Sequence, residues 1–234
     1  MSDCYNDLLN EFIQNNHLEN INTNSVEKAL THPSYTNDMN LPYTECYERL
    51  EFLGDAVLKL ITSDILYKKY PDFREGKMTN LRAGLVSDEF ILNFANELNL
   101  SKYIRISSSL EKDGGREIPS ILSCAFEALL GAMFESGFSY ERIFGFVENL
   151  TEKYFGLLKC QLPKFNSKSM LQEYTQSIDK SLPEYVTESV PSGFSTKVVY
   201  HDNTIGVGTA KTKKEAEREA AYNACVNLFG EKNE

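Results

Sequence analysis

The chain has 234 residues, of which 41% are apolar, and its net charge at pH 7 is -10. This length can bury a hydrophobic core and is compatible with one large domain or two smaller ones, and we expect two. The negative charge excludes a general avidity for nucleic acid, because phosphate neutralisation needs Lys and Arg. Any nucleic-acid site must therefore be a local basic patch.

The cysteines and the amino terminus indicate the compartment. The five cysteines are odd in number, scattered and never in a C-x-x-C pair, which argues against a disulfide framework and against a cysteine zinc site. The first residues, MSDCYNDLLNEF, are acidic and lack a basic stretch followed by an apolar run, and no segment has the apolar length of a membrane span. We therefore expect a soluble, cytoplasmic protein with no membrane partner.

Helical periodicity predominates from the amino terminus to about residue 158 and predicts an all-α domain. Ser25 is the predicted N-cap of a short helix through SVEKALTH, and a long helix is expected from about Glu45 until Pro71 ends it. Two shorter helices follow in GKMTNLRAGL and SDEFILNFANEL. After the polar loop EKDGGREIP, the segment SILSCAFEALLGAMFESG is typical of a buried helix that ends near Gly137.

A last amphipathic helix is expected from about Tyr140 to Leu157, after which Pro, Asn and Ser break the pattern and predict a linker. The predicted domains are residues 1–159 and 168–234, joined by a linker over residues 160–167. In the second domain the helix SMLQEYTQSI precedes the strands EYVTES, FSTKVVY and TIGVGTA, and the helix TKKEAEREAAYNACVNLF closes it, with Thr212 as the predicted cap. The predicted order is α-β-β-β-α, a small α+β domain.

Three carboxylates, Glu48, Glu51 and Asp55, lie in the apolar stretch YERLEFLGDAVLKL. Their offsets of three and four place them within roughly 60° of one another on one stripe of the long helix. The opposite face is expected to be packed and contains Leu50, Leu53, Val57 and Leu60. Arg49 and Lys59 are expected to lie off the stripe, so the clustered negative charge has no evident partner on its own helix.

A fourth carboxylate, Glu127, lies in the middle of the apolar segment SCAFEALLGAM, where an ionised group is costly unless it is paired or binds a metal. Acids that converge from two helices suit Mg²⁺ or Mn²⁺, but an internal salt-bridge network fits the spacing equally well. A di-iron bundle is excluded because none of the histidines, at positions 17, 32 and 201, has a Glu three residues before it.

Five segments together closely resemble the ribonuclease III family: ALTHPSY, ERLEFLGDAVL, GKMTNLRAGLV, GGREIPSILSCAFEALLGA and an LQEY-containing carboxy-terminal domain. The resemblance implies an all-α endonuclease domain that forms a homodimer, followed by a double-stranded-RNA-binding domain. It implies hydrolysis of double-stranded RNA that depends on Mg²⁺, for which Mn²⁺ can substitute. The products would carry 5′ phosphates and short 3′ overhangs, as in RNA processing.

Carried over by position, the catalytic residues are Glu48, Glu51, Asp55 and Glu127. The resemblance implies that the last three are direct or water-bridged metal ligands and that Glu48 supports substrate placement. The chain departs from the family at Cys124, where an Asp is usual. A thiol is a poor ligand for a hard cation, so the alternative is a weakened or inactive nuclease that still binds duplex RNA.

The resemblance also assigns residues outside the acidic site. Gln172 and Glu173 are expected to meet the RNA minor groove, and Lys211, Lys213 and Lys214 to contact phosphates, although a lysine cluster followed by Glu215, Glu217 and Glu219 can equally be a solvated, salt-paired face. The loop in SVPSGFSTK is short and lacks the family's usual Gly-Pro-x-His element. Phe52 is expected to insert into a socket on the partner subunit, or else to be an ordinary core aromatic, whereas His32 and Tyr35 are expected to be structural.

Overall fold

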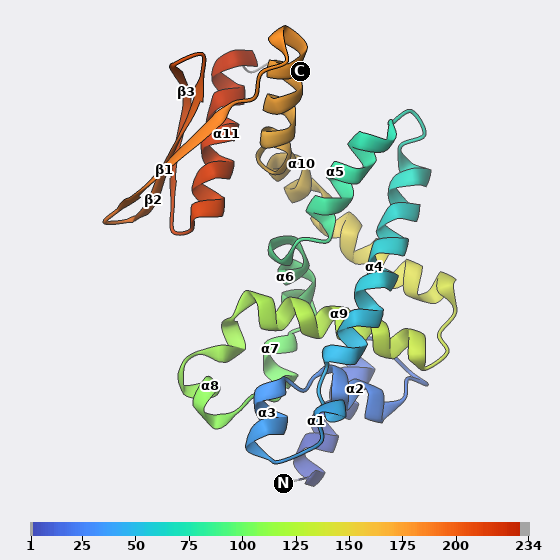
Figure 1. The fold of residues 1–234 in the computed structure, drawn as a ribbon. Coiled ribbons are helices and arrows are strands. Elements are labelled where there is room, and N and C mark those ends of the chain that lie inside the picture. Colours follow the sequence, from blue (N-terminus) through green and yellow to red (C-terminus); the bar gives the residue numbers. More distant parts are fainter. Residues whose placement is uncertain (1, 230–234) are drawn as a thin grey trace. The chain divides into compact units, whose positions relative to one another are not determined.

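The computed structural model describes residues 2–229, and within that range the side chains of residues 5–154 and 167–228. The chain divides into two compact units, Met1–Gly156 and Leu157–Glu234, and each is described by itself. Figure 1 shows that the first unit is built from helices and that the second contains a small sheet. Among the described residues, no helix combines the length and the apolarity that a membrane crossing requires.

The described part of the first unit is helical apart from one isolated bridge between Thr31 and Arg105, which confirms the all-α prediction. Its elements are α1 Ser2–Asn15, α2 Thr23–Ala29, α3 Pro33–Asp38, the 3-10 turn Tyr43–Glu45, α4 Glu48–Lys69, α5 Glu75–Leu85, α6 Asp88–Glu97, α7 Leu100–Tyr103, α8 Ser108–Lys112, the 3-10 turn Gly115–Glu117, α9 Pro119–Glu135 and the start of α10, Tyr140–Asp179.

Helices α4 and α9 form the centre of this unit and pack with their backbones in direct contact (Figure 1). A Cβ atom on Gly54 of α4 would lie 1.7 Å from the carbonyl oxygen of Glu127 on α9. A Cβ atom on Gly131 of α9 would lie 2.1 Å from the carbonyl oxygen of Leu50 on α4. Only glycine permits so close an approach, and this approach brings the acids of α4 beside Glu127.

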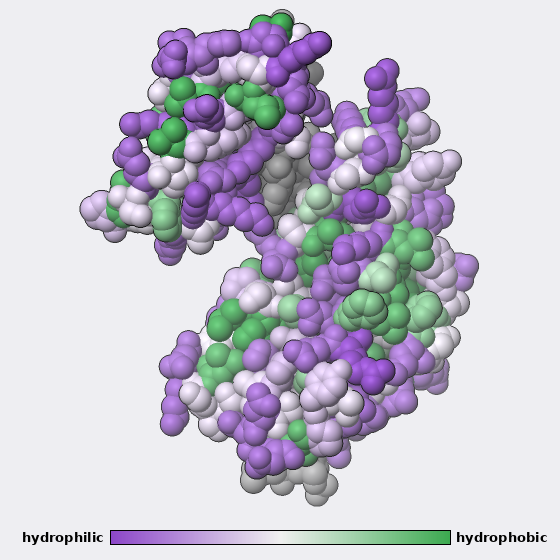
Figure 2. Space-filling model, viewed as in Figure 1, coloured by the Kyte–Doolittle hydropathy of each residue, from purple (hydrophilic) through white to green (hydrophobic). Residues whose placement is uncertain are grey.

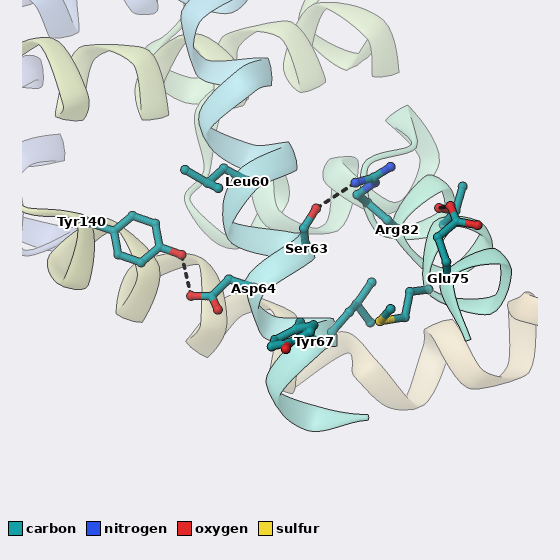
Figure 3. A pocket seen from close by; sticks show the side chains of 10 residues that line it. Leu60, Ser63, Asp64, Tyr67, Glu75, Arg82 and Tyr140 are labelled. Atoms are coloured by element: carbon teal, nitrogen blue, oxygen red, sulfur yellow. Dashed lines mark hydrogen bonds between the residues drawn. The ribbon is translucent and has the colours of Figure 1, made fainter. Parts of the chain in front are cut away.

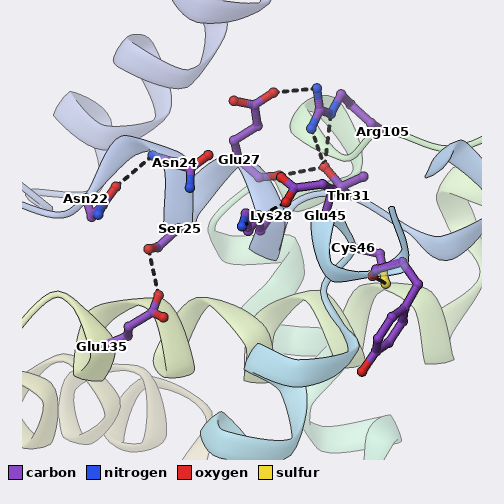
Figure 4. Close-up of polar contacts among 11 residues, drawn as sticks. Asn22, Asn24, Ser25, Glu27, Lys28, Thr31, Glu45, Cys46, Arg105 and Glu135 are labelled. Atoms are coloured by element: carbon purple, nitrogen blue, oxygen red, sulfur yellow. Dashed lines mark hydrogen bonds and ion pairs between the residues drawn. The ribbon is translucent and has the colours of Figure 1, made fainter. Parts of the chain in front are cut away.

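The predicted cap of α2 was wrong. Asn22 is the N-cap, because its side chain accepts a hydrogen bond from the backbone N–H of Asn24 at 2.9 Å. Ser25 lies inside the helix and is buried, and its Oγ donates to Oε2 of Glu135 on α9 at 2.7 Å (Figure 4). A long-range partner thus uses the hydroxyl that the local pattern had assigned to capping.

The second unit has the predicted α-β-β-β-α order. Its strands are β1 Glu184–Val190, β2 Gly193–Tyr200 and β3 Asn203–Ala210, which form an antiparallel sheet in the order β1-β2-β3, and the closing helix is α11 Lys213–Phe229. Thr212 is the cap, as predicted. The backbone N–H of Glu215 donates to Oγ1 of Thr212 at 3.3 Å, and the N–H of Thr212 donates to Oε2 of Glu215 at 3.2 Å.

Residues 160–167 are helical, which differs from the predicted break, since α10 is assigned without interruption from Tyr140 to Asp179. The residues before Pro163 are mostly Leu, Lys and Gln, which favour helix, and one proline removes a single backbone donor without necessarily ending a helix. The division between the two units falls inside α10. The domain boundaries given above stay a prediction.

Candidate active site

The four acids singled out in the sequence surround one open pocket of about 480 Å³. Glu48 and Glu51 are in the first turn of α4, Asp55 follows one turn later, and Glu127 comes from the middle of α9. Phe52 completes the lining. The contact between the glycines of α4 and α9 therefore joins residues that are more than 70 positions apart in the sequence.

Negative charge is crowded in this pocket. Burial and, after it, the carboxylates of Asp55, Glu51 and Asp88 together raise the pKa of Glu127 to about 7. Burial also raises the pKa of Glu51, and Glu48, Asp55 and Asp88 act in the same direction. Like charges in a half-buried site favour either protonation or the binding of a cation.

Lys59 provides part of the compensation, which differs from its predicted place off the stripe. Its Nζ lies 2.7 Å from Oδ2 of Asp55, four residues earlier on α4. Residues four positions apart share a helix face, so Lys59 extends the acidic stripe by one turn. Both side chains are more than one-third exposed, at 52% and 37%, so solvent screens this ion pair.

The thiol of Cys124 is also part of the site. It donates a hydrogen bond to the carboxylate of Glu51, and burial together with the charge of Glu51 raises the pKa of Cys124 to about 12. Cys124 is therefore protonated at neutral pH and adds no negative charge to the pocket. The thiol instead donates to a carboxylate oxygen of Glu51.

The chemistry of the donors fits a hard divalent cation, because all four acids offer oxygen. The side chains are not gathered into a ready coordination shell, however, since among the described residues no three His, Cys, Asp or Glu side chains converge as metal ligands. Two of the acids have other partners, because Asp55 pairs with Lys59 and Glu51 accepts from Cys124. Cation binding would require these side chains to turn.

Asp88 is a residue near the pocket that sequence reasoning missed. It is the first residue of α6, and its Oδ1 accepts a hydrogen bond from Oγ of Ser123 on α9 at 3.0 Å. The segment SDEF does indicate a helix start, since Ser87 caps α6 by accepting from the N–H of Phe90 at 3.3 Å. No signal in the sequence pairs Asp88 with Ser123, which are 35 positions apart.

Beside the acidic stripe, α4 presents an exposed apolar stripe, which consists of Phe52, Ala56, Leu60 and Tyr67. Phe52 is 82% exposed, so it is not a core aromatic, and Tyr67 is 71% exposed. Leu60 is 59% exposed, so its predicted place on the packed face was wrong. Figure 2 shows apolar surface gathered over α4 and the elements beside it in this unit.

A second pocket, of about 450 Å³, continues this apolar stripe between α4, α5 and the start of α10 (Figure 3). Leu60, Tyr67 and Tyr140 contribute to its wall. Tyr140 donates to Oδ2 of Asp64 at 2.6 Å, and Nη1 of Arg82 donates to Oγ of Ser63 at 2.9 Å, which positions the polar rim.

In the second unit the five residues assigned to RNA contact are all exposed: Gln172, Glu173, Lys211, Lys213 and Lys214. Among the described side chains, none of the three lysines forms a salt bridge, which argues against the salt-paired alternative, and Glu217 pairs instead with Lys168 at 2.5 Å. Only two residues separate β1 from β2, so the short loop expected there is present. His32 caps α3 by accepting from the N–H of Ser34 at 3.0 Å.

Comparisons with known proteins identify the family. The family model described as Ribonuclease-III-like matches residues 22–149, and the model of the double-stranded RNA binding motif matches residues 167–228. A protein named Ribonuclease 3 from Oceanobacillus iheyensis is 40% identical over 209 residues, which cover 87% of this chain and 90% of the relative. Ribonuclease 3 from Listeria monocytogenes serovar 1/2a is 36% identical over 213 residues, with 89% and 92% covered.

The solved nuclease domain of ribonuclease III from Campylobacter jejuni superposes with a TM-score of 0.56 at 38% identity. The match covers 62% of this chain and 96% of that domain, which is described as having structural flexibility in a region involved in dimer formation. The helical unit with its acidic pocket, the α-β-β-β-α order of the second unit and these relatives all indicate the same family. The chain belongs to the ribonuclease III family and is a ribonuclease III-type endoribonuclease that acts on double-stranded RNA.

Proposed function

We propose that the pocket formed by Glu48, Glu51, Asp55 and Glu127 is the active site of this endoribonuclease. The observation that carries the proposal is that α4 and α9 direct four carboxylates into one pocket, where burial and the like charges raise the pKa of Glu127. Glu51, Asp55 and Glu127 would hold the cation, and Glu48, at the exposed end of α4, would support placement of the RNA.

The family is metal-dependent, and we propose Mg²⁺ as the cation, with Mn²⁺ able to substitute, because all the acidic donors are hard oxygens. When bound, such a cation supplies the positive charge that makes phosphodiester hydrolysis possible at neutral pH. In the structure Lys59 pairs with Asp55 and the Cys124 thiol interacts with Glu51, so these two side chains would orient the carboxylates that would hold the cation. The products would have 5′ phosphates and short 3′ overhangs.

For RNA binding, we propose that the exposed lysines before and at the start of α11 contact phosphates, while Gln172 and Glu173 on α10 meet the minor groove. The first residues of α11 are also the positive end of a 17-residue helix, which favours phosphate. Because the lysines have no described ion-pair partner, little has to be broken when RNA binds.

For assembly, we propose a homodimer in which the exposed stripe of α4 meets a second copy of the chain. Phe52 lines the acidic pocket and is 82% exposed, so covering it would bury a large aromatic side chain. We place the enzyme in the cytoplasm, and the described cysteines, Cys46, Cys124 and Cys225, are all free thiols, as expected in a reducing compartment.

The test is incubation of the purified protein with duplex RNA, single-stranded RNA and duplex DNA, with Mg²⁺, with Mn²⁺ and with a chelator. Only duplex RNA should be cut, and only when a cation is present. A ligase that requires 5′ phosphates should be able to join the products. Intact duplex RNA under both cations, combined with measurable binding, would instead support an inactive RNA-binding protein.

A further inference from the structure

Asp88 lies next to the candidate active site although it belongs to none of the segments that form it. It begins α6, and its Oδ1 accepts from Oγ of Ser123 at 3.0 Å. Ser123 is buried, at 1% exposure, and directly precedes Cys124 on α9. The start of α6 is therefore tied to the turn of α9 that contains Cys124.

The Asp88–Ser123 hydrogen bond also lies near Glu127. Ser123 and Glu127 are four residues apart and are neighbours on one face of α9. The negative charge of Asp88 acts on residues of both central helices, because it contributes to the raised pKa values of Glu51 on α4 and of Glu127 on α9. Among the described side chains, no Lys or Arg pairs with Asp88, so its charge is not cancelled locally.

We propose that Asp88 is a positioning residue that compensates for Cys124. It holds the turn of α9 that contains Cys124 and Glu127 through the Ser123 hydroxyl, and it places a carboxylate beside the position where Cys124 replaces the family's usual aspartate. The inference rests on the active site proposed above.

The charge of Asp88 has a measurable consequence. A carboxylate near a divalent cation in a solvent-accessible site changes the cation's affinity on the order of three- to tenfold without touching it. Asp88→Asn removes this charge but keeps a side-chain oxygen that can accept from Ser123. Ser123→Ala does the reverse, since it removes the hydrogen bond and leaves the charge.

Titration calorimetry of the full chain with Mn²⁺, beside a cleavage assay over a range of Mn²⁺ concentrations, tests the proposal. We expect Asp88→Asn to weaken Mn²⁺ binding about three- to tenfold and to raise the Mn²⁺ concentration for half-maximal cleavage by a similar factor. Ser123→Ala should lower the cleavage rate while changing Mn²⁺ affinity less than twofold. The control is Glu89→Gln, which removes the adjacent charge from the same turn of α6 and should leave both quantities unchanged.

Unchanged Mn²⁺ affinity of Asp88→Asn, beside a clear loss in Glu127→Gln, would overturn the role of Asp88 and leave the active site standing. Unchanged affinity in both variants would overturn the active site itself.

A double variant tests compensation directly. In the Cys124→Asp background a ligand carboxylate is restored, so the effect of Asp88→Asn on Mn²⁺ affinity should fall below twofold. An effect of equal size in both backgrounds would show that Asp88 does not compensate for Cys124.

Discussion

Replacing Glu127 by Gln tests two things separately: how much the crowded negative charge destabilises the fold, and whether Glu127 is needed for RNA cleavage. In wild type the pKa of Glu127 is raised from 4.5 to about 7, so the folded protein holds this proton more tightly than the unfolded chain. The contribution of protonated Glu127 to the free energy of unfolding is fully present below pH 4.5 and is lost as the pH rises to about 7. Gln does not titrate and avoids this loss.

The magnitude follows from the two pKa values. The interval from 4.5 to about 7 corresponds to about 3 kcal/mol at 1.36 kcal/mol per pH unit. Because Glu127 is only partly buried, solvent screening reduces the expected gain to about 1–2 kcal/mol. In chelator, Glu127→Gln should thus be more stable than wild type by this amount at pH 8 and by little at pH 4.5.

Urea unfolding at both pH values measures this gain, and Glu141→Gln, at the exposed start of α10, is the matched control for the loss of one charge. Adding Mg²⁺ at pH 8 should raise the unfolding midpoint of wild type and not that of Glu127→Gln. Cleavage should fall by about 100-fold or more while RNA binding is retained. If Glu127→Gln is no more stable than wild type at pH 8, crowded negative charge does not destabilise the pocket. If the variant cleaves RNA as fast as wild type, Glu127 is not part of the active site.

Three further variants test the remaining proposals. Cys124→Asp should increase cleavage in Mg²⁺ and lower the Mg²⁺ requirement, with a smaller gain in Mn²⁺; a loss of several kcal/mol in a melting curve without faster cleavage would show that position 124 is core filler. Replacing Lys213 and Lys214 together by Ala should weaken binding to all duplex sequences alike and reduce the slope of log K against log salt by about 1–2; an unaltered slope would show that both lysines are merely solvated. Phe52→Ala should shift the protein toward monomer in light scattering, with little effect on the monomer's stability because Phe52 is 82% exposed; an unchanged dimer would place Phe52 outside the interface.

The sequence by itself predicted the long helices, the order of elements in the second unit and the common helix face of three acidic residues. The spacing of Glu48, Glu51 and Asp55 predicted their common helix face, and Thr212 as a cap predicted the start of α11. Both depend on residues within one or two helical turns, for which helix geometry gives the neighbours directly. The helical first unit and the α-β-β-β-α second unit followed from the same local periodicities.

Only the tertiary structure decided which distant groups meet. The close approach of α4 and α9 at Gly54 gathers the four acids, and it is also the packing of α9 that takes Ser25 from its predicted cap and brings Asp88 to Ser123. Leu60 is exposed for the related reason that the packed face of α4 is set by its neighbours and not by its own hydrophobic residues. Such contacts join residues 35 or more positions apart, and their pairing depends on how whole helices pack, which no local spacing encodes.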